Sequence, residues 1–79
     1  MAWFVYMLWC GDGSLYTGCT DNVPRRLAVH QSGKGAKYTR SRLPVSLIYQ
    51  EEVPDKPAAL RREAAIKRLT RSQKLKLIE

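Results

Sequence analysis

The chain opens with an apolar run from Trp3 to Cys10, which ends at the turn residues Gly11 to Ser14. A second β-prone segment, Tyr16-Thr17-Gly18, follows that turn. Two such runs separated by a Gly/Asp turn predict a β-hairpin. The hairpin would bring Tyr6 and Tyr16 close together, although they are ten residues apart in the sequence.

The register of this hairpin decides whether the two tyrosines share a face, because a slip of one residue turns a side chain to the other side of the sheet. If Cys10 pairs with Tyr16, the two phenols point the same way. If Cys10 pairs with Leu15, they point apart. We favour the first register, which also keeps Cys10 and Cys19 too far apart for a disulfide.

A helix is predicted after the hairpin. Asp21 or Asn22 can cap it, and Pro24 fits its first turn. The helix would run to residue 30 or 31 and stop at Gly33.

The buried stripe of this helix is marked by Val23 and Leu27, which are spaced i, i+4. Arg26 and His30 have the same spacing and follow one edge of the stripe. We therefore expect both at the border between core and solvent, where they can reach a shallow cleft while their stems stay packed.

A basic loop is expected from Ser32 to Arg42, with one short helical turn near residues 36–39. Gly33 and Gly35 would let backbone N–H groups approach an anion. The cationic side chains of the loop are Lys34, Lys37, Arg40 and Arg42. Contact with nucleic-acid phosphates and a merely solvated loop both remain open.

The third strand is predicted from Val45 to Val53, between two prolines. Its alternation suits a sheet with one face better buried than the other. A second long helix over Ala58–Leu69 follows, capped by Asp55. Thr70 or Ser72 can cap a last short helix.

Glu63 breaks the apolar stripe of the second long helix, because Leu60 lies three residues before it and Ile66 three after it. A desolvated charge is costly, so a partner or a metal is expected. Lys67 or Arg26 could supply a structural ion pair. We favour a functional role, since breaks in pattern often mark sites.

Together these elements follow one another in the order β-β-α-β-α-α and make one domain over residues 1–79. No apolar run approaches the roughly 20 residues that span a bilayer. Two cysteines without a CxxC motif or a preceding signal peptide favour a reduced, cytoplasmic protein.

The charge of the chain points to a polyanionic partner. Lys and Arg number 14 against 7 Asp and Glu, which gives a formal charge of +7. No acid lies between Asp21 and Glu51, where six Lys and Arg residues fall. This clustering favours a nucleic acid over ordinary solubility charge.

The candidate catalytic residues are Tyr6, Tyr16, Arg26, His30 and Glu63, and they suggest phosphodiester hydrolysis. A single carboxylate suits one Mg²⁺ or Mn²⁺ ion whose other ligands are water and phosphate oxygens. An arginine can stabilise charge at phosphorus. A tyrosine is a poor base unless nearby cations lower its pKa, and the positive charge of this chain could do so. Zinc is disfavoured, because the ligand spacing is absent.

These residues give the chain a resemblance to GIY-YIG nucleases, specifically to small stand-alone bacterial members. The signature is Phe4-Val5-Tyr6 followed by Tyr16-Thr17-Gly18 at the usual distance. Arg26, His30 and Glu63 follow at the family positions of the arginine, the His or Tyr, and the metal-binding glutamate. Phe-Val and Thr replace the Gly-Ile and Ile of the two motifs, and both changes keep strand propensity.

The resemblance implies an α+β fold, in which a three-stranded antiparallel sheet is flanked by helices and carries a shallow catalytic face. It also implies roles for these positions. Glu63 would bind one divalent metal, and Arg26 would contact the scissile phosphate. Tyr16 would act as general base or position the nucleophile, with Tyr6 supporting it and His30 sharing the proton transfer. Larger relatives attach DNA-binding domains, for which this chain has no room. Specificity would then come from DNA structure or a protein partner, or be absent.

The function expected is a metal-dependent endonuclease for branched, damaged or single-stranded DNA, in repair or recombination, with RNA as the alternative substrate. The alternative is a nucleic-acid-binding module that keeps the fold without turnover. A basic adaptor for another protein is a third interpretation.

Overall fold

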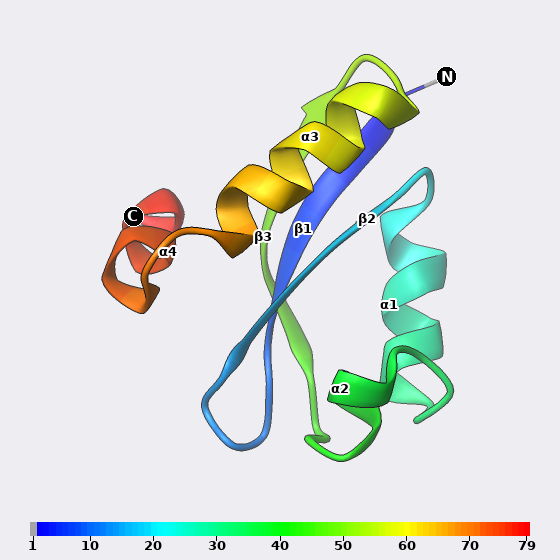
Figure 1. The fold of residues 1–79 in the computed structure, drawn as a ribbon. Helices are drawn as coiled ribbons and strands as arrows, with labels where there is room; N and C mark the ends of the chain where they lie inside the picture. Colours follow the sequence, from blue (N-terminus) through cyan, green and yellow to red (C-terminus); the bar gives the residue numbers. More distant parts are fainter. Residues whose placement is uncertain (1) are drawn as a thin grey trace.

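The computed structural model describes residues 2–79, which form a three-stranded antiparallel sheet flanked by helices, as predicted (Figure 1). The elements are β1 (Trp3–Trp9), β2 (Leu15–Thr20), α1 (Val23–Gln31), α2 (Lys37–Arg40), β3 (Ser46–Val53), α3 (Lys56–Lys67) and α4 (Arg71–Ile78). The short helix α2 lies where a single helical turn was expected. Within this described part, no helix is long and apolar enough to cross a membrane.

Side-chain caps begin the longer helices at the positions that the sequence suggested. Asn22 accepts a hydrogen bond from the Arg25 backbone N–H at 3.1 Å, and Asp55 accepts one from Ala58 at 2.9 Å. Thr70 starts α4 with a capping box. Each cap satisfies an N–H group that the first turn leaves without an intrahelical partner.

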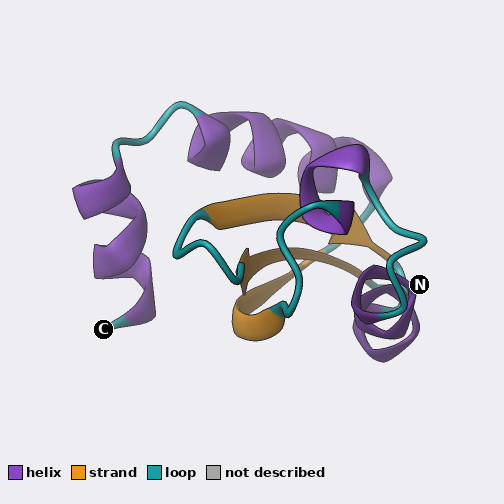
Figure 2. Ribbon diagram, turned by 90° about the horizontal axis from the view of Figure 1, so that it is seen from below, coloured by secondary structure: helices purple, strands orange, loops and turns teal. Residues whose placement is uncertain are grey.

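The central strand β1 lies between β2 and β3 and is buried on both faces, which explains its continuous apolar run. On one face Val5 and Met7 pack with Ala59 and Ile66 of α3. On the other face Tyr6 heads a second cluster. Figure 2 shows the strands in the middle of the molecule with the helices around them.

The observed register of the hairpin confirms the shared face of the two tyrosines but corrects the pairing. Tyr16 lies opposite Leu8, and Tyr6 lies opposite Gly18. The expected pair of Cys10 with Tyr16 is wrong by two residues, because Cys10 instead closes the turn through a 2.9 Å bond from its N–H to the Ser14 carbonyl. A shift of two residues preserves the face of every side chain. Both cysteines are free thiols, as expected.

Strand β3 departs from the predicted alternation because it carries a bulge. Met7 pairs with Tyr49 and the next residue, Leu8, pairs with Leu47, so Ile48 is an extra residue. Leu47 then packs beside the Tyr6 cluster, while Ile48 and Tyr49 pack on the α3 side. The burial still alternates on either side of the bulge, since residues 46, 50 and 52 are exposed and residues 47, 49, 51 and 53 are partly buried, so Ile48 is the departure from the expected pattern.

Candidate active site

The aromatic rings of three candidate catalytic residues, Tyr6, Tyr16 and His30, lie together on the α1 side of the sheet. The ring centroids of Tyr6 and Tyr16 lie 6.5 Å apart, and that of His30 lies 5.9 Å from Tyr6 and 5.2 Å from Tyr16. The hairpin supplies the two phenols, and the last turn of α1 supplies the imidazole. Segments separated in the sequence are thus brought into one cluster.

His30 is fully buried, so its expected place at the border between core and solvent is wrong. Its Nε2 lies 2.9 Å from the Tyr6 hydroxyl, and its Nδ1 lies 2.9 Å from the Thr39 hydroxyl. The loop after α1 folds over the ring so closely that a Cβ at Gly35 would clash with Nδ1. The amphipathic pattern of α1 alone gave no sign of this cover.

Tyr6 is also buried, at 2 % exposure, and its phenol crosses directly over Gly18. A Cβ at position 18 would stand 2.6 Å from the Tyr6 hydroxyl oxygen. The glycine that ends the second motif therefore makes room for the tyrosine that ends the first. This close approach links the two motifs physically.

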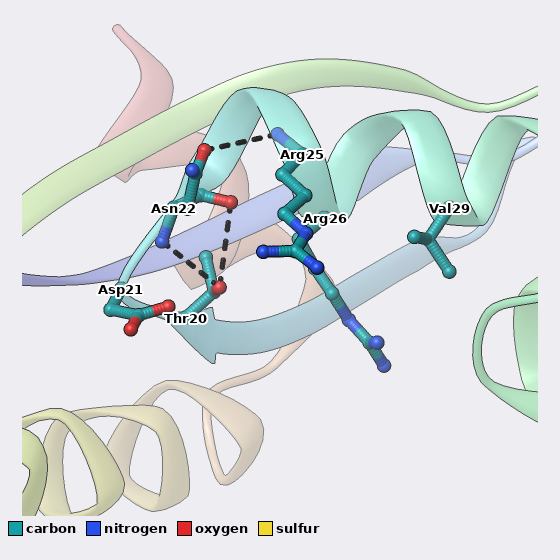
Figure 3. A pocket seen from close by; sticks show the side chains of 6 residues that line it. All are labelled: Thr20, Asp21, Asn22, Arg25, Arg26 and Val29. Atoms are coloured by element: carbon teal, nitrogen blue, oxygen red, sulfur yellow. Dashed lines mark hydrogen bonds between the residues drawn. The ribbon is translucent and has the colours of Figure 1, made fainter.

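Arg26 lies in the first half of α1, and its side chain lines a cavity of about 300 Å³ (Figure 3). The cavity is lined by Thr20, Asp21, Asn22, Arg25, Arg26 and Val29. The Arg26 guanidinium lies near both phenols, because it lowers the pKa of Tyr6 and that of Tyr16. Arg26 thus joins the cluster of rings to an open hollow at the surface.

Burial dominates the titration of both phenols. It raises the pKa of Tyr6 to about 12, against the smaller lowering effect of the Arg26 hydrogen bond. Burial also raises the pKa of Tyr16, although the charges of Lys67 and Arg26 oppose it. Nearby cations do lower both pKa values, as expected, but burial outweighs them and neither phenol becomes more acidic than a free tyrosine. Both residues are neutral phenols at neutral pH, suited to orienting a reactant by hydrogen bonds.

Glu63 approaches the cluster from α3, at the edge strand β2. Its charge raises the pKa of Tyr16, and it adds to the burial that raises the pKa of Cys19 to about 11. Its carboxylate forms an ion pair with Lys67 at 2.8 Å. The Glu63 side chain is 18 % exposed and that of Lys67 is 52 % exposed. The structural ion pair that the sequence allowed is thus present.

The donor set at Glu63 fits one hard cation. Within residues 2–79, no group of three His, Cys, Asp or Glu side chains is placed to hold a metal. A cation at Glu63 would therefore take its remaining ligands from water and phosphate oxygens, as Mg²⁺ does readily. The competing Lys67 is half exposed, and an i, i+4 pair of this kind is worth only about 0.3–0.5 kcal/mol.

The basic loop is docked against the body of the protein through Arg42. Its Nε donates to Asp12 in the hairpin turn at 3.0 Å, and its guanidinium lies 3.9 Å from the centre of the Tyr38 ring. Tyr38 lies beside Tyr16, with 5.8 Å between ring centroids. Arg42 therefore has a structural role besides the predicted phosphate contact. The other three predicted contacts, Lys34, Lys37 and Arg40, are exposed.

Sequence reasoning missed the partners that hold the cluster in place. Thr39 binds His30, Gly35 covers it, and Cys19 lies beside Glu63. The paired glycines of the loop hinted at close backbone approach, but toward an anion rather than a buried ring. Nothing in the local pattern singled out Thr39 or Cys19.

Comparison with known proteins gives the class of this fold. The family model described as the GIY-YIG catalytic domain matches residues 2–76. The chain belongs to the GIY-YIG family, a nuclease family that binds DNA and generally uses a divalent metal.

Its relatives within that family are small UPF0213 proteins. One from Streptococcus sanguinis is 62 % identical over 96 % of this chain and 87 % of its own length. Another from Staphylococcus haemolyticus is 57 % identical over 96 % and 93 %. The solution NMR structure of a UPF0213 protein from Bacillus halodurans has a TM-score of 0.62 at 49 % identity, covering 99 % of this chain and 83 % of that one.

Proposed function

We propose that this protein is a metal-dependent endonuclease that hydrolyses phosphodiester bonds in DNA. One observation supports this function above all. Two phenols, an imidazole and a guanidinium converge on one side of β2, and a carboxylate reaches the same edge strand from α3. Such an arrangement offers a positive group and oriented donors around a place for a cation.

In this proposal each residue has a separate task. Arg26 binds the scissile phosphate and stabilises the charge that develops on it. Tyr16 orients the attacking water by hydrogen bonding, and Tyr6 with His30 holds Arg26 and Tyr16 in place. Glu63 would hold one Mg²⁺ or Mn²⁺ ion, which when bound polarises the phosphoryl oxygen and stabilises the leaving oxygen.

The exposed cations of the basic loop extend the contact surface for DNA. Lys37 and Arg40 lie in α2 and Lys34 lies just before it, and the same short helix carries Tyr38, whose ring lies beside Tyr16. They would bind backbone phosphates and keep the substrate over the cluster. Branched, damaged and single-stranded DNA are the substrates to compare.

A DNA-binding module without turnover is the second candidate function. The ion pair between Glu63 and Lys67 favours it, because a carboxylate already neutralised by a lysine needs no metal. Such a module would bind DNA weakly, and its affinity for DNA would fall steeply as the salt concentration rises.

Substitution of Glu63 separates the two candidates. In Mn²⁺, we expect the wild-type protein to cut branched, nicked or single-stranded DNA and the Glu63→Gln variant to lose cleavage while keeping its thermal unfolding midpoint. Glu52→Gln is the matched control, since it removes the same charge from an exposed position on β3 and should cut normally. Salt-sensitive binding by the wild type without any cut product would establish the binding module instead.

A further inference from the structure

A line of hydrogen bonds crosses the interior from α2 to β1. The Thr39 hydroxyl donates to the Ala36 carbonyl at 2.9 Å and lies 2.9 Å from His30 Nδ1. The other ring nitrogen, Nε2, lies 2.9 Å from the Tyr6 hydroxyl. Thr39, His30 and Tyr6 are 0 %, 0 % and 2 % exposed. No solvent contact therefore competes for these groups.

The direction of each bond follows from counting protons. A hydroxyl has one hydrogen, and that of Thr39 goes to the Ala36 carbonyl, so Thr39 must accept from an N–H at His30 Nδ1. Burial lowers the pKa of His30 below its ordinary value, with a smaller contribution from the charge of Arg26, so the ring is neutral at pH 7. A neutral imidazole has one N–H, so Nε2 accepts and the Tyr6 hydroxyl donates to it.

We propose that Thr39 is a positioning residue that fixes the Nδ1–H tautomer of His30 and thereby orients the Tyr6 hydroxyl. With its hydrogen directed inward to Nε2, the Tyr6 oxygen presents its lone pairs to Arg26. A guanidinium has only donors, so it needs this acceptor. In the opposite tautomer, His30 Nε2–H would point at the Tyr6 oxygen, and the phenolic hydrogen would turn toward a group that has only donors.

The consequence for cleavage rests on the proposed function. Arg26 can stabilise a phosphate only from a fixed position, and Tyr6 is a buried group whose pKa the guanidinium lowers. Thr39 would then influence catalysis through two intermediate side chains without touching DNA. The tautomer itself is a property of the folded protein and can be measured without substrate.

Thr39→Val and Thr39→Ser separate the hydroxyl from simple packing. Valine keeps the shape and removes the acceptor, whereas serine keeps the acceptor and removes a methyl group. His30 is the single histidine of the chain, so two-bond ¹H–¹⁵N correlations of its ring at neutral pH give an unambiguous readout.

We expect the His30 ring to be protonated at Nδ1 and unprotonated at Nε2 in the wild type and in Thr39→Ser. In Thr39→Val we expect a populated tautomer that is protonated at Nε2. Three results would each overturn the proposal. They are a wild type with Nε2–H or a charged ring, a Thr39→Val spectrum like the wild type, and a Thr39→Ser spectrum like Thr39→Val. The wild-type spectrum alone decides the first, even where a variant fails to fold.

The cleavage assay tests the link to Arg26. In Mn²⁺, Thr39→Val should lower kcat by roughly 10-fold or more with little change in KM, as displaced catalytic groups do, while Thr39→Ser stays near the wild type. A changed tautomer with unchanged kcat would overturn the positioning role. A wild type that never cuts DNA would refute the proposed function and leave the tautomer result standing.

Discussion

The two sides of β2 hold their polar groups in different ways. On the α1 side, both nitrogens of His30 are hydrogen-bonded, and the ring and its partners are buried. On the α3 side, Glu63 relies on a lysine that is half exposed. There, too, the buried Thr17 hydroxyl has no hydrogen-bond partner within residues 2–79.

This difference divides the candidate site into two halves. We call Tyr6, Tyr16, Arg26 and His30 the fixed half, and Glu63 with Lys67 the exchangeable half. Buried and fully satisfied polar groups are rigid, because any rearrangement leaves one of them without a partner. A half-exposed ion pair can open at small cost. We infer that the α1 side positions Arg26 and the phenols, while the α3 side remains available for a cation.

Removing the cation of the fixed half should have the largest effect. We expect Arg26→Ala to reduce the cleavage rate in Mn²⁺ by roughly 10²-fold, as the loss of other preorganised charge stabilisers does. Binding to uncut DNA should change much less, because in the proposed function several other cations would contact the DNA backbone. Single-turnover rates and binding titrations on the same DNA give both quantities.

Arg25→Ala is the matched control for this prediction. Arg25 precedes Arg26 on α1 and lines the same cavity, and it is exposed. Its loss should weaken binding slightly and leave the rate near that of the wild type. If Arg26→Ala instead lowers binding and rate equally, Arg26 is a phosphate anchor only, and the fixed half has no catalytic task.

The fixed half should also give stability a dependence on pH. Burial holds the pKa of His30 below its ordinary value of about 6.5, so the unfolded chain takes up a proton that the folded chain refuses. This contribution is fully present above about pH 6.5 and is lost as the pH falls toward the folded pKa. The slope from one proton is at most about 1.4 kcal/mol per pH unit.

Urea unfolding of the wild type and His30→Gln between pH 7.5 and 5.5 measures that slope. Glutamine removes the titration and keeps a polar side chain, so the variant should be less stable at pH 7.5 but flatter with pH. Parallel curves for the two proteins would show that His30 is not held neutral by the fold.

Local sequence signals predicted the frame of this site well. The caps at Asn22, Asp55 and Thr70 and the turn after Cys10 depend on short-range geometry, which a few residues determine. The shared face of the two phenols followed from the parity of the register. The pairing itself did not, because registers two residues apart bury the same side chains.

Longer-range contacts account for what the sequence did not reveal. His30 is buried only because the loop that carries Gly35 and Thr39 folds back over α1. The raised pKa of Tyr16 likewise depends on how much water the assembled fold removes. For Glu63, the pattern break predicted a partner or a metal, and the helix itself supplied the partner one turn away.

The exchangeable half can be tested by removing the lysine that competes for Glu63. Because an i, i+4 pair is worth about 0.3–0.5 kcal/mol, Lys67→Met should tighten Mn²⁺ binding by roughly twofold. Lys76→Met removes the same charge from an exposed position on α4 and should leave the affinity unchanged. Calorimetric titration of the three proteins with Mn²⁺ gives the comparison. Weaker binding in Lys67→Met would mean that the lysine supports the Glu63 carboxylate in the metal-bound state, so that the two halves of the site are equally fixed.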